Sequence, residues 1–271
     1  MLFPYAQANF KEAQALLIGI PDESKCLGRR GCSLGPDYIR KVATMHNVFK
    51  DGTLQLPQVG EINFNLCDLG NIKKSDISSI PKLKEKLPIF IGGDHSITFE
   101  IIKALNYEKL SIIYFDAHPD AICSRKKYFG SVVCDILNAY PQYRILEIGT
   151  RAMNKEELSN LENKKIKFFS PMEIDEKRKK ILAQIKKIGK PIYLSIDMDC
   201  FDPAFAPGVC TPSPFGLNPN FVLEVAKLIS NKIVGFDIMQ TNPNYDLYEN
   251  TGQIASNLII NILALIFENK K

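Results

Sequence analysis

The sequence contains no tryptophan, only three histidines, and seven cysteines at irregular spacings. The odd number of cysteines, without a CxxC pair or a secretory leader, argues against a disulfide framework and favours reduced thiols in the cytoplasm. No Ser/Gly-rich linker, repeat or low-complexity tract divides the chain. We therefore expect residues 1–271 to form one domain.

The chain also has little net charge and no long apolar run. Its formal charge is +4, from 34 basic and 30 acidic residues, and the lysines are scattered along expected helix faces such as 173–190. This balance gives no electrostatic footprint for nucleic acid. Ser256, Asn257 and Asn261 interrupt the most apolar stretch, IASNLIINILALIF, which is too short to cross a bilayer. We expect a helix that faces the core, and no membrane partner.

Short β-rich runs alternate with helical stretches along nearly the whole chain, and 45% apolar residues are enough to bury a substantial core. Most of these runs are apolar on both faces, which predicts a parallel sheet covered on each side by helices. The eight expected strands are 14–20, 66–70, 87–92, 111–116, 144–149, 166–169, 191–197 and 233–239. The expected helices are 36–48, 97–106, 155–163, 173–188, 219–230 and 252–268.

Three of these strands end in residues that bind metals well. The segments are GGDHS (92–96), DAHPD (116–120) and DMDCFDP (197–203). In an extended chain residues i and i+2 point to the same side, so Asp116 pairs with His118 and Asp197 with Asp199. Ligands of open parallel sheets bind beyond the carboxyl ends of the strands. The long Pro/Gly-rich loop 201–219 leaves the sheet at one such end, as functional loops often do.

Four carboxylates at one sheet edge would repel one another and raise some of their pKa values unless cations neutralise them. Two divalent ions would cancel four negative charges. Oxygen-rich donors with two imidazoles suit manganese better than zinc, which prefers thiolates. Two such ions about 3.5–4 Å apart can share a water and lower its pKa towards ~7, which predicts metal-assisted hydrolysis. The candidate ligands are His95, Asp116, His118, Asp120, Asp197 and Asp199.

Each segment also has a simpler interpretation. GGDHS could be a glycine turn followed by the helix-capping Ser96. Aspartates commonly end strands and form turns, which is the expected role of Asp202 before Pro203. Three such motifs at the same end of parallel strands favour the metal interpretation over the separate turns.

The same segments resemble the ureohydrolase family, which comprises arginase, agmatinase, formimidoylglutamase and guanidino acid hydrolases. The resemblance extends over nearly the whole chain, in family order. It implies an α/β fold, three-layer α/β/α with a mainly parallel eight-stranded sheet, agmatinase-like activity on a small-molecule substrate, and a homo-oligomer, either a trimer or a hexamer. The matching segments are GGDHS, DAHPD, SIDMDCFDPAFAPG and GFDIMQTNPNYD, with weaker similarity in GRRGCSLGPDYIR and IGTR.

Carried over to this sequence, the resemblance implies two manganese ions. One would be held by His95, Asp116, Asp120 and Asp197, and the other by Asp116, His118, Asp197 and Asp199. Asp116 and Asp197 would then bridge the ions. A hydroxide between them would attack the trigonal carbon of a guanidinium or amidine, and the tetrahedral intermediate would collapse to urea and an amine.

The chain departs from the family pattern in the segment that follows the DAHxD motif. Where the family has a histidine after the DAHxD motif, this chain has Phe129 and Gly130. The third histidine, His46, lies in an expected helix and is interpreted as an ordinary helix residue. We therefore expect Asp120 or water to supply the proton route.

A second departure concerns the substrate. Gln240 stands where the family has a glutamate that holds the cationic substrate, and Asn154 lies close to where arginases hold an aspartate against the substrate amine. A hydrogen bond to a charged group contributes ~1.5–3 kcal/mol, against ~1 for a neutral pair. Gln240 keeps the reach of glutamate but loses its charge.

Two functions follow from these features. The first is a binuclear manganese hydrolase that cleaves a linear C–N bond of a guanidino compound such as agmatine. The second is a metal-binding paralogue that takes a neutral formimino or amidine substrate, which Gln240 could satisfy as donor and acceptor, or that has little activity and serves as a structural or regulatory partner.

Three smaller expectations concern residues around the site. Ser195 and Cys200 are interpreted as packing residues rather than nucleophiles, because no base lies nearby in sequence. Cys123 and Cys134 are expected to be buried thiols, or reactive ones at the pocket rim. Arg151 is expected either to hold pocket loops or to form a structural ion pair.

Overall fold

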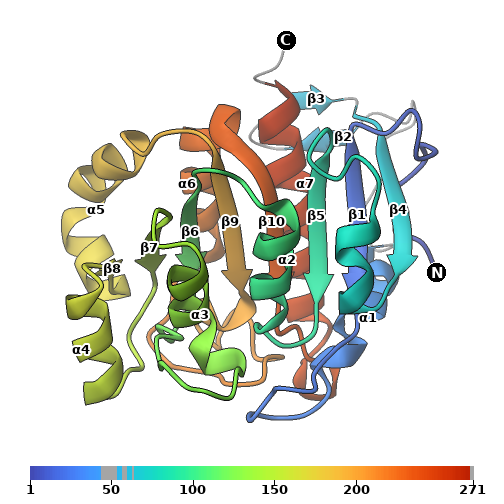
Figure 1. Ribbon diagram of the computed structural model, residues 1–271. Helices are drawn as coiled ribbons and strands as arrows, with labels where there is room; N and C mark the ends of the chain where they lie inside the picture. Colours follow the sequence, from blue (N-terminus) through green and yellow to red (C-terminus); the bar gives the residue numbers. More distant parts are fainter. Residues whose placement is uncertain (44–53, 57–59, 63, 269–271) are drawn as a thin grey trace.

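The computed structural model describes residues 1–43, 54–56, 60–62 and 64–268. Eight parallel strands form one sheet in the order β4-β1-β5-β10-β9-β6-β7-β8 (Figure 1). All eight strands expected from the sequence are present. They are β1 (Ala15–Ile20), β4 (Leu66–Asn71), β5 (Leu87–Gly92), β6 (Ser111–Phe115), β7 (Arg144–Ile148), β8 (Lys167–Phe169), β9 (Ile192–Asp197) and β10 (Ile233–Met239).

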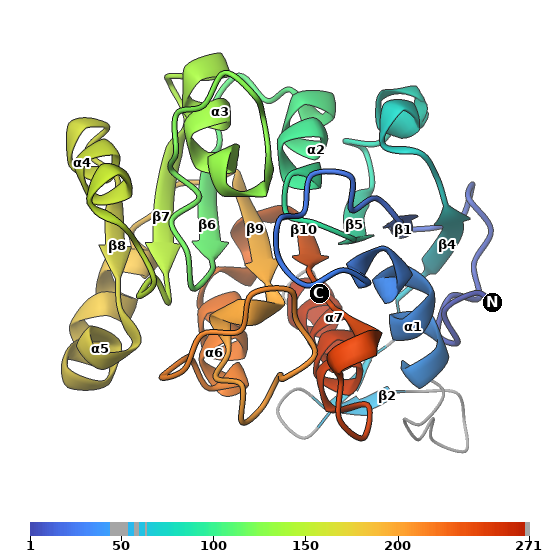
Figure 2. The same ribbon diagram turned by 90° about the horizontal axis from the view of Figure 1, so that it is seen from below.

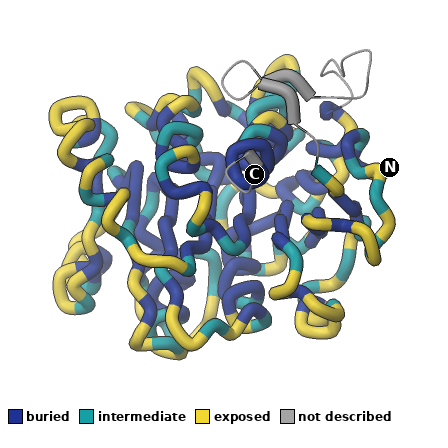
Figure 3. Tube along the Cα trace, turned by 90° about the horizontal axis from the view of Figure 1, so that it is seen from above, coloured by how far each residue is buried: buried dark blue, intermediate teal, exposed yellow. Residues whose placement is uncertain are grey.

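Helices cover both faces of the sheet, which confirms the expected three-layer α/β/α fold (Figure 2). One face carries α1 (Gly35–Val42), α5 (Pro171–Lys186), α6 (Pro219–Ile229) and α7 (Asn250–Glu268). The other carries α2 (Ile97–Leu105), α3 (Val132–Ala139) and α4 (Lys155–Asn163). The burial of strand residues on both faces explains why the sequence shows apolar runs rather than alternation (Figure 3).

Some elements differ from the sequence expectations. Helix α3 was not expected, and neither was the small antiparallel pair of β2 (Leu54–Leu56) and β3 (Gly60–Ile62). Helix α1 follows the start of the expected helix 36–48, but His46 lies outside the described residues. The single-domain organisation remains a prediction.

Helix α7 contains the most apolar stretch of the chain. The expectation that it is too short to cross a bilayer was wrong, because the helix extends the apolar stretch to the 18-residue window Asn250–Phe267, which is long and apolar enough to do so; however, 72% of this window is buried inside the protein. Its buried side chains, among them Leu258, Ile262 and Leu265, belong to the core on the α7 face of the sheet. These contacts match the expected core-facing helix.

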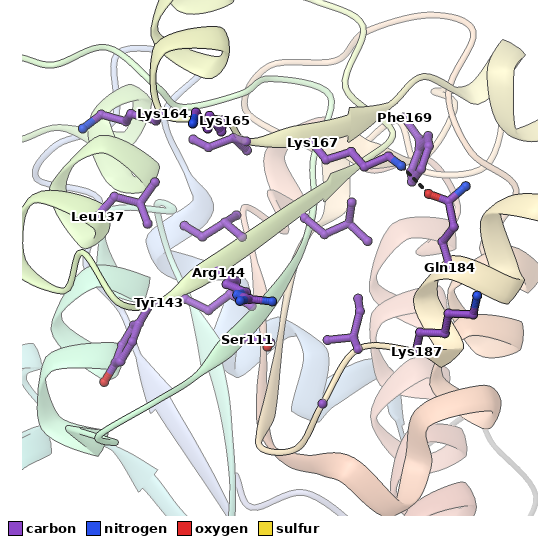
Figure 4. Close-up of a pocket in the computed structure, with 16 residues that line it drawn as sticks. Ser111, Leu137, Tyr143, Arg144, Lys164, Lys165, Lys167, Phe169, Gln184 and Lys187 are labelled. Atoms are coloured by element: carbon purple, nitrogen blue, oxygen red, sulfur yellow. Dashed lines mark hydrogen bonds between the residues drawn. The ribbon is translucent and has the colours of Figure 1, made fainter.

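The amino ends and the carboxyl ends of the strands carry side chains of opposite charge. At the amino ends of β6, β7 and β8, a cavity of about 520 Å³ is lined by five basic residues among mainly apolar ones (Figure 4). None of its lining residues is an aspartate, glutamate or histidine, so this cavity offers no ligands for a hard metal ion. The basic residues are Arg144, Lys164, Lys165, Lys167 and Lys187. The three acidic segments GGDHS, DAHPD and DMDCFDP all lie at the opposite end, where the strands finish.

Candidate metal centre

Four neighbouring strands in the middle of the sheet deliver the candidate site. β5, β10, β9 and β6 lie side by side, and their carboxyl ends lead into His95, Gln240, Asp197 and Asp116 respectively. The chain can turn sharply after β5 because Gly93 has no side chain, since a Cβ there would lie 2.0 Å from the carbonyl oxygen of Asp22. This arrangement brings together candidate ligands as far apart in sequence as His95 and Asp199.

The deep half of the site is centred on His95, which is completely buried. Its Nδ1 lies 2.8 Å from Asp116 Oδ2, 3.0 Å from Asp197 Oδ2 and 3.5 Å from Asp120 Oδ2. His95, Asp116 and Asp197 form a cluster whose donor atoms are close enough together to hold one metal ion. We call His95, Asp116, Asp197 and Asp120 the deep half.

The outer half is centred on His118, whose side chain is 27% exposed. Its Nδ1 lies 3.2 Å from Asp199 Oδ2 and 3.4 Å from Asp116 Oδ1. These three residues form a second cluster that could hold a metal ion. The two oxygens of Asp116 thus face different histidines, which places this carboxylate between the halves.

Asp120 differs from the other expected ligands. Its backbone has a φ of 45°, a left-handed conformation that is uncommon for residues other than glycine and often found at functional sites. Its Oδ2 accepts a 2.6 Å hydrogen bond from the hydroxyl of Tyr114, which also lies 2.9 Å from His95 Nδ1. The structure therefore places Asp120 beside the deep cluster, held by a tyrosine that the sequence analysis did not identify.

The crowding of carboxylates shifts the pKa values as expected. Burial, together with the charge of Asp116, raises the pKa of Asp120 well above its usual value, and burial with the charges of Asp199 and Asp116 does the same for Asp197. Burial alone would lower the pKa of His118, but the charges of Asp199 and Asp116 raise it to about 12. The strongly negative potential of the crowded carboxylates contributes to all three raised pKa values, and this potential would equally favour the binding of cations.

One oxygen of the site has no hydrogen-bond partner. Asp197 Oδ2 is buried and lies 3.0 Å from His95 Nδ1, but it accepts no hydrogen bond from that nitrogen when the ring proton is on Nε2; the other Asp197 oxygen accepts one from the backbone N–H of Asp199. Leaving a buried carboxylate oxygen unpaired is costly unless a cation neutralises it. The donor set and this unpaired oxygen both fit divalent metal ions.

A chain of hydrogen bonds fixes the orientation of His95 from behind. Its Nε2 lies 2.9 Å from Ser195 Oγ, and the Ser195 hydroxyl donates to Asp237 Oδ1 at 2.8 Å. Thr98 and Tyr193 donate to the other oxygen of Asp237. With Nε2 as the donor, Nδ1 is left free to face the carboxylates, which is the arrangement that metal-binding histidines require.

These hydrogen bonds correct the interpretation of Ser195 as a packing residue, because the Ser195 hydroxyl contacts His95 directly. Asp237 was not identified either, although it pairs with Ser195 in the register of β10 and β9. A sequence signal existed only for Tyr114, which precedes Asp116 by two residues and shares its side of the strand. Asp237 could be found only once the strand order was known.

The opposite wall of the site contains Gln240, which is buried and has a left-handed φ of 64°. The hydroxyl of Thr211 donates to Asp199 Oδ2 at 2.6 Å and lies 3.3 Å from Gln240 Oε1. Gln240 is therefore one hydroxyl away from an expected ligand of the outer half.

Asn154 lies elsewhere and has a structural contact. It is exposed and caps the first turn of α4, where its side chain accepts a hydrogen bond from the backbone N–H of Glu157. The Glu157 carboxylate in turn accepts the backbone N–H of Asn154. A role of Asn154 in substrate binding remains a proposal.

The long loop after β9 is held in place by Arg151. The guanidinium donates to the carbonyl oxygens of Asp199, Ser213 and Pro214, among others, which confirms the expected loop-holding role. No carboxylate pairs with Arg151 within the described residues, so the ion-pair alternative is wrong. Asp202 forms a turn as expected, because its carboxylate accepts the backbone N–H groups of Ala204 and Gly216.

The expectation of seven reduced cysteines is wrong for one pair. Cys123 and Cys134 form a disulfide between the segment after DAHPD and helix α3. The separation of 11 residues did not predict this disulfide, because the pairing requires helix α3 to pack with Cys134 next to Cys123. The other five cysteines are free and buried, including Cys200.

Comparison with known proteins agrees with this geometry. A sequence profile of the arginase family matches residues 13–265. The chain belongs to the arginase family. It is 30% identical to an agmatinase of Serratia proteamaculans over 94% of this chain and 88% of that protein, and 28% identical to the mitochondrial guanidino acid hydrolase of Homo sapiens over 96% and 80%.

A solved structure supports the same assignment. The agmatine ureohydrolase of Thermoplasma volcanium superposes with a TM-score of 0.86 at 29% identity, covering 99% of this chain and 95% of that one. This family consists of hydrolases that act on C–N bonds of guanidino and amidine compounds and use a binuclear metal centre. The present chain is thus an arginase-family ureohydrolase with a buried His/Asp cluster able to bind metal.

Proposed function

We propose that this protein is a binuclear manganese hydrolase that cleaves a linear C–N bond of a small guanidino or amidine compound, as agmatinases do. The observation that carries the proposal is the convergence of two histidines and three carboxylates from the ends of three strands, in two clusters that share Asp116, with Asp120 beside the deep one. Such a shared carboxylate is suited to bridging two cations.

The proposed ligands divide between the two halves. His95, Asp116, Asp120 and Asp197 would hold one ion, and Asp116, His118, Asp197 and Asp199 the other. Donors consisting of carboxylate oxygens and two imidazoles favour manganese over ions that prefer thiolates. When bound, two divalent ions supply a nucleophile from water at neutral pH and stabilise the charge that develops on the substrate.

The protein's own residues would position this chemistry. Asp237 and Ser195 fix the ring of His95, and Thr211 fixes the carboxylate of Asp199. We assign the proton route to Asp120, which receives a proton from the attacking water and returns it to the leaving nitrogen as the C–N bond breaks. Tyr114 would hold the Asp120 carboxylate in place through its 2.6 Å hydrogen bond.

The substrate is the finer part of the proposal. Similar proteins named agmatinase and guanidino acid hydrolase make agmatine and short guanidino acids the first candidates. The buried Gln240 beside Thr211 favours a second candidate, a neutral formimino group, because an amide offers both a donor and an acceptor. We keep Asn154 as a proposed contact to the far end of the substrate.

The test is a screen of manganese-loaded protein against arginine, agmatine, guanidinobutyrate, guanidinopropionate and formiminoglutamate. Urea release from a guanidino compound supports the first candidate, and formamide or ammonium release from formiminoglutamate supports the second. The matched control is Asp199→Asn, which keeps the shape of a ligand but removes its charge. Silence towards all five compounds with two metals bound would favour the partner role over catalysis.

Two further parts of the proposal concern the protein in the cell. We propose a homo-oligomer, a trimer or hexamer, which light scattering coupled to gel filtration measures directly. We also propose a cytoplasmic location, which the five free cysteines favour, whereas the Cys123–Cys134 disulfide is unusual for a reducing compartment.

A further inference from the structure

Three cysteines meet away from the His/Asp centre. The sulfurs of Cys26, Cys32 and Cys210 all lie within 4.8 Å of one another. All three are free and buried, and they form a small cluster of their own, apart from the two large cores of the fold. Ordinary packing of an isolated cysteine does not require three thiols to face one another, so the arrangement calls for a separate explanation.

The cluster joins two distant parts of the chain. Cys26 and Cys32 lie in the loop between β1 and α1, whereas Cys210 lies in the long loop after β9. The loops are docked by backbone contacts, because Arg29 N–H donates to the Cys210 carbonyl at 3.0 Å. Asn242 Nδ2 lies 3.2 Å from the carbonyl oxygens of both Arg29 and Arg30. The thiols therefore face one another on a fixed backbone.

We propose that Cys26, Cys32 and Cys210 form a second metal site, which binds a soft d¹⁰ cation, zinc, and fastens the β1–α1 loop to the wall of the catalytic centre. Zinc–sulfur bonds of about 2.3 Å in a tetrahedron place the sulfurs about 3.8 Å apart. Since the three sulfurs lie within 4.8 Å, each pair needs to close by at most about 1 Å. Thiolates select zinc over manganese, so manganese loaded first at the His/Asp centre would not occupy the cysteines.

A fourth donor is close to the cluster. Glu23 Oε2 lies 3.6 Å from Cys32 Sγ, and it is already oriented by the backbone N–H of Gly31 at 2.7 Å. Three thiolates and one carboxylate would leave a zinc site with net negative charge. Arg30 is placed to offset it, because its guanidinium contacts Glu23 at 3.3 Å and the Cys26 carbonyl at 3.2 Å.

The thiols would have to lose their protons to bind the ion, since the thiolate is the metal ligand. Binding should therefore release protons and grow stronger as the pH rises.

Cys210 connects the cysteine cluster to the His/Asp centre through the residue that follows it. The next residue, Thr211, donates to Asp199 and lies beside Gln240. A zinc ion at the cysteines would thus hold rigid the segment that positions the outer half of the His/Asp centre. The zinc proposal does not depend on the proposed activity, because its donors are the three cysteines and Glu23 rather than the His/Asp ligands.

The experiment counts metals in full-length protein purified under reducing conditions. The protein is loaded with manganese, then with zinc, and both metals are measured per chain after gel filtration. We expect Cys32→Ser and Cys210→Ser to retain one zinc per chain less than the wild type. The matched control is Cys67→Ser, which alters a buried free cysteine outside the cluster and should retain the wild-type zinc content.

A second measurement uses the wild-type protein alone, so it does not depend on the folding of a variant. Cobalt added in place of zinc should produce a thiolate-to-cobalt charge-transfer absorption, which the His/Asp centre cannot produce. Absence of this band, equal zinc in wild type and Cys32→Ser, or a disulfide within the cluster of the reduced protein would overturn the proposal. Inactivity towards every guanidino compound would leave these metal counts unaffected.

Discussion

The deep and outer halves of the His/Asp centre differ in how firmly their histidines are held. His95 is completely buried, and the Ser195–Asp237 pair fixes it from behind. His118 is partly exposed, and among the described residues its Nε2 has one hydrogen-bonding contact, Ser213 Oγ at 3.5 Å. The deep half is built to hold a cation with little motion, whereas the outer half leaves room for a substrate to approach. The four predictions below test this difference.

The largest effect should come from a ligand that is proposed to hold both ions. Asp197→Asn keeps the shape of the side chain but removes its negative charge from the deep cluster, where the buried Oδ2 would otherwise attract a cation. We expect kcat/KM to fall roughly 10³-fold or more, with metal content below two ions per chain. Asp202→Asn, which alters only a turn, should leave the metal content unchanged.

The second prediction compares the supports of the two histidines. Ser195→Ala removes the acceptor for His95 Nε2 in the deep half and should weaken metal binding about 10- to 100-fold. Ser213→Ala removes a long contact to an exposed ring and should change it less than about threefold. Isothermal titration with manganese measures both. Equal losses in the two variants would show that the halves are not held differently.

The third prediction concerns pH and follows from His118. Its pKa is raised to about 12 by Asp199 and Asp116, so in metal-free protein it carries a proton at neutral pH. A metal ion must displace that proton, so apparent affinity should rise with pH, roughly tenfold per unit for each proton released. Titrations at pH 6.5 and 8.5 in buffers of different ionisation enthalpy count the protons. Affinity independent of pH would contradict this picture of the outer half.

The smallest effect concerns the substrate wall of the outer half. Gln240→Glu restores a charge one hydroxyl away from Asp199 and should raise kcat/KM for a guanidinium substrate about tenfold, the equivalent of about 1.4 kcal/mol. Gln240→Leu serves as the control without hydrogen bonding. If Gln240→Glu were as inert as the parent towards arginine, agmatine and guanidino acids, the missing charge would not be the reason for weak activity.

The sequence was informative wherever a local pattern determined the structure. Apolar runs located all eight strands and therefore the strand ends that carry the ligands. The extended pairing of Asp116 with His118 and of Asp197 with Asp199 was wrong, because both pairs meet in turns after the strands, where each first aspartate accepts the backbone N–H of its partner. The sequence was uninformative where partners come from different strands. Asp237 supports His95 only because β10 lies next to β9, and Cys210 meets Cys26 only through the packing of two loops. Helix α3 was missed because its eight residues carry too short a helical pattern.

The central claim is that two manganese ions lie between His95 and His118, with Asp116 and Asp197 shared between them. Anomalous diffraction at the manganese absorption edge, from crystals of the manganese-loaded protein, tests it most directly. The account predicts two peaks, one beside His95 Nδ1 and one beside His118 Nδ1. A single peak, or peaks only at other places on the protein, would contradict it.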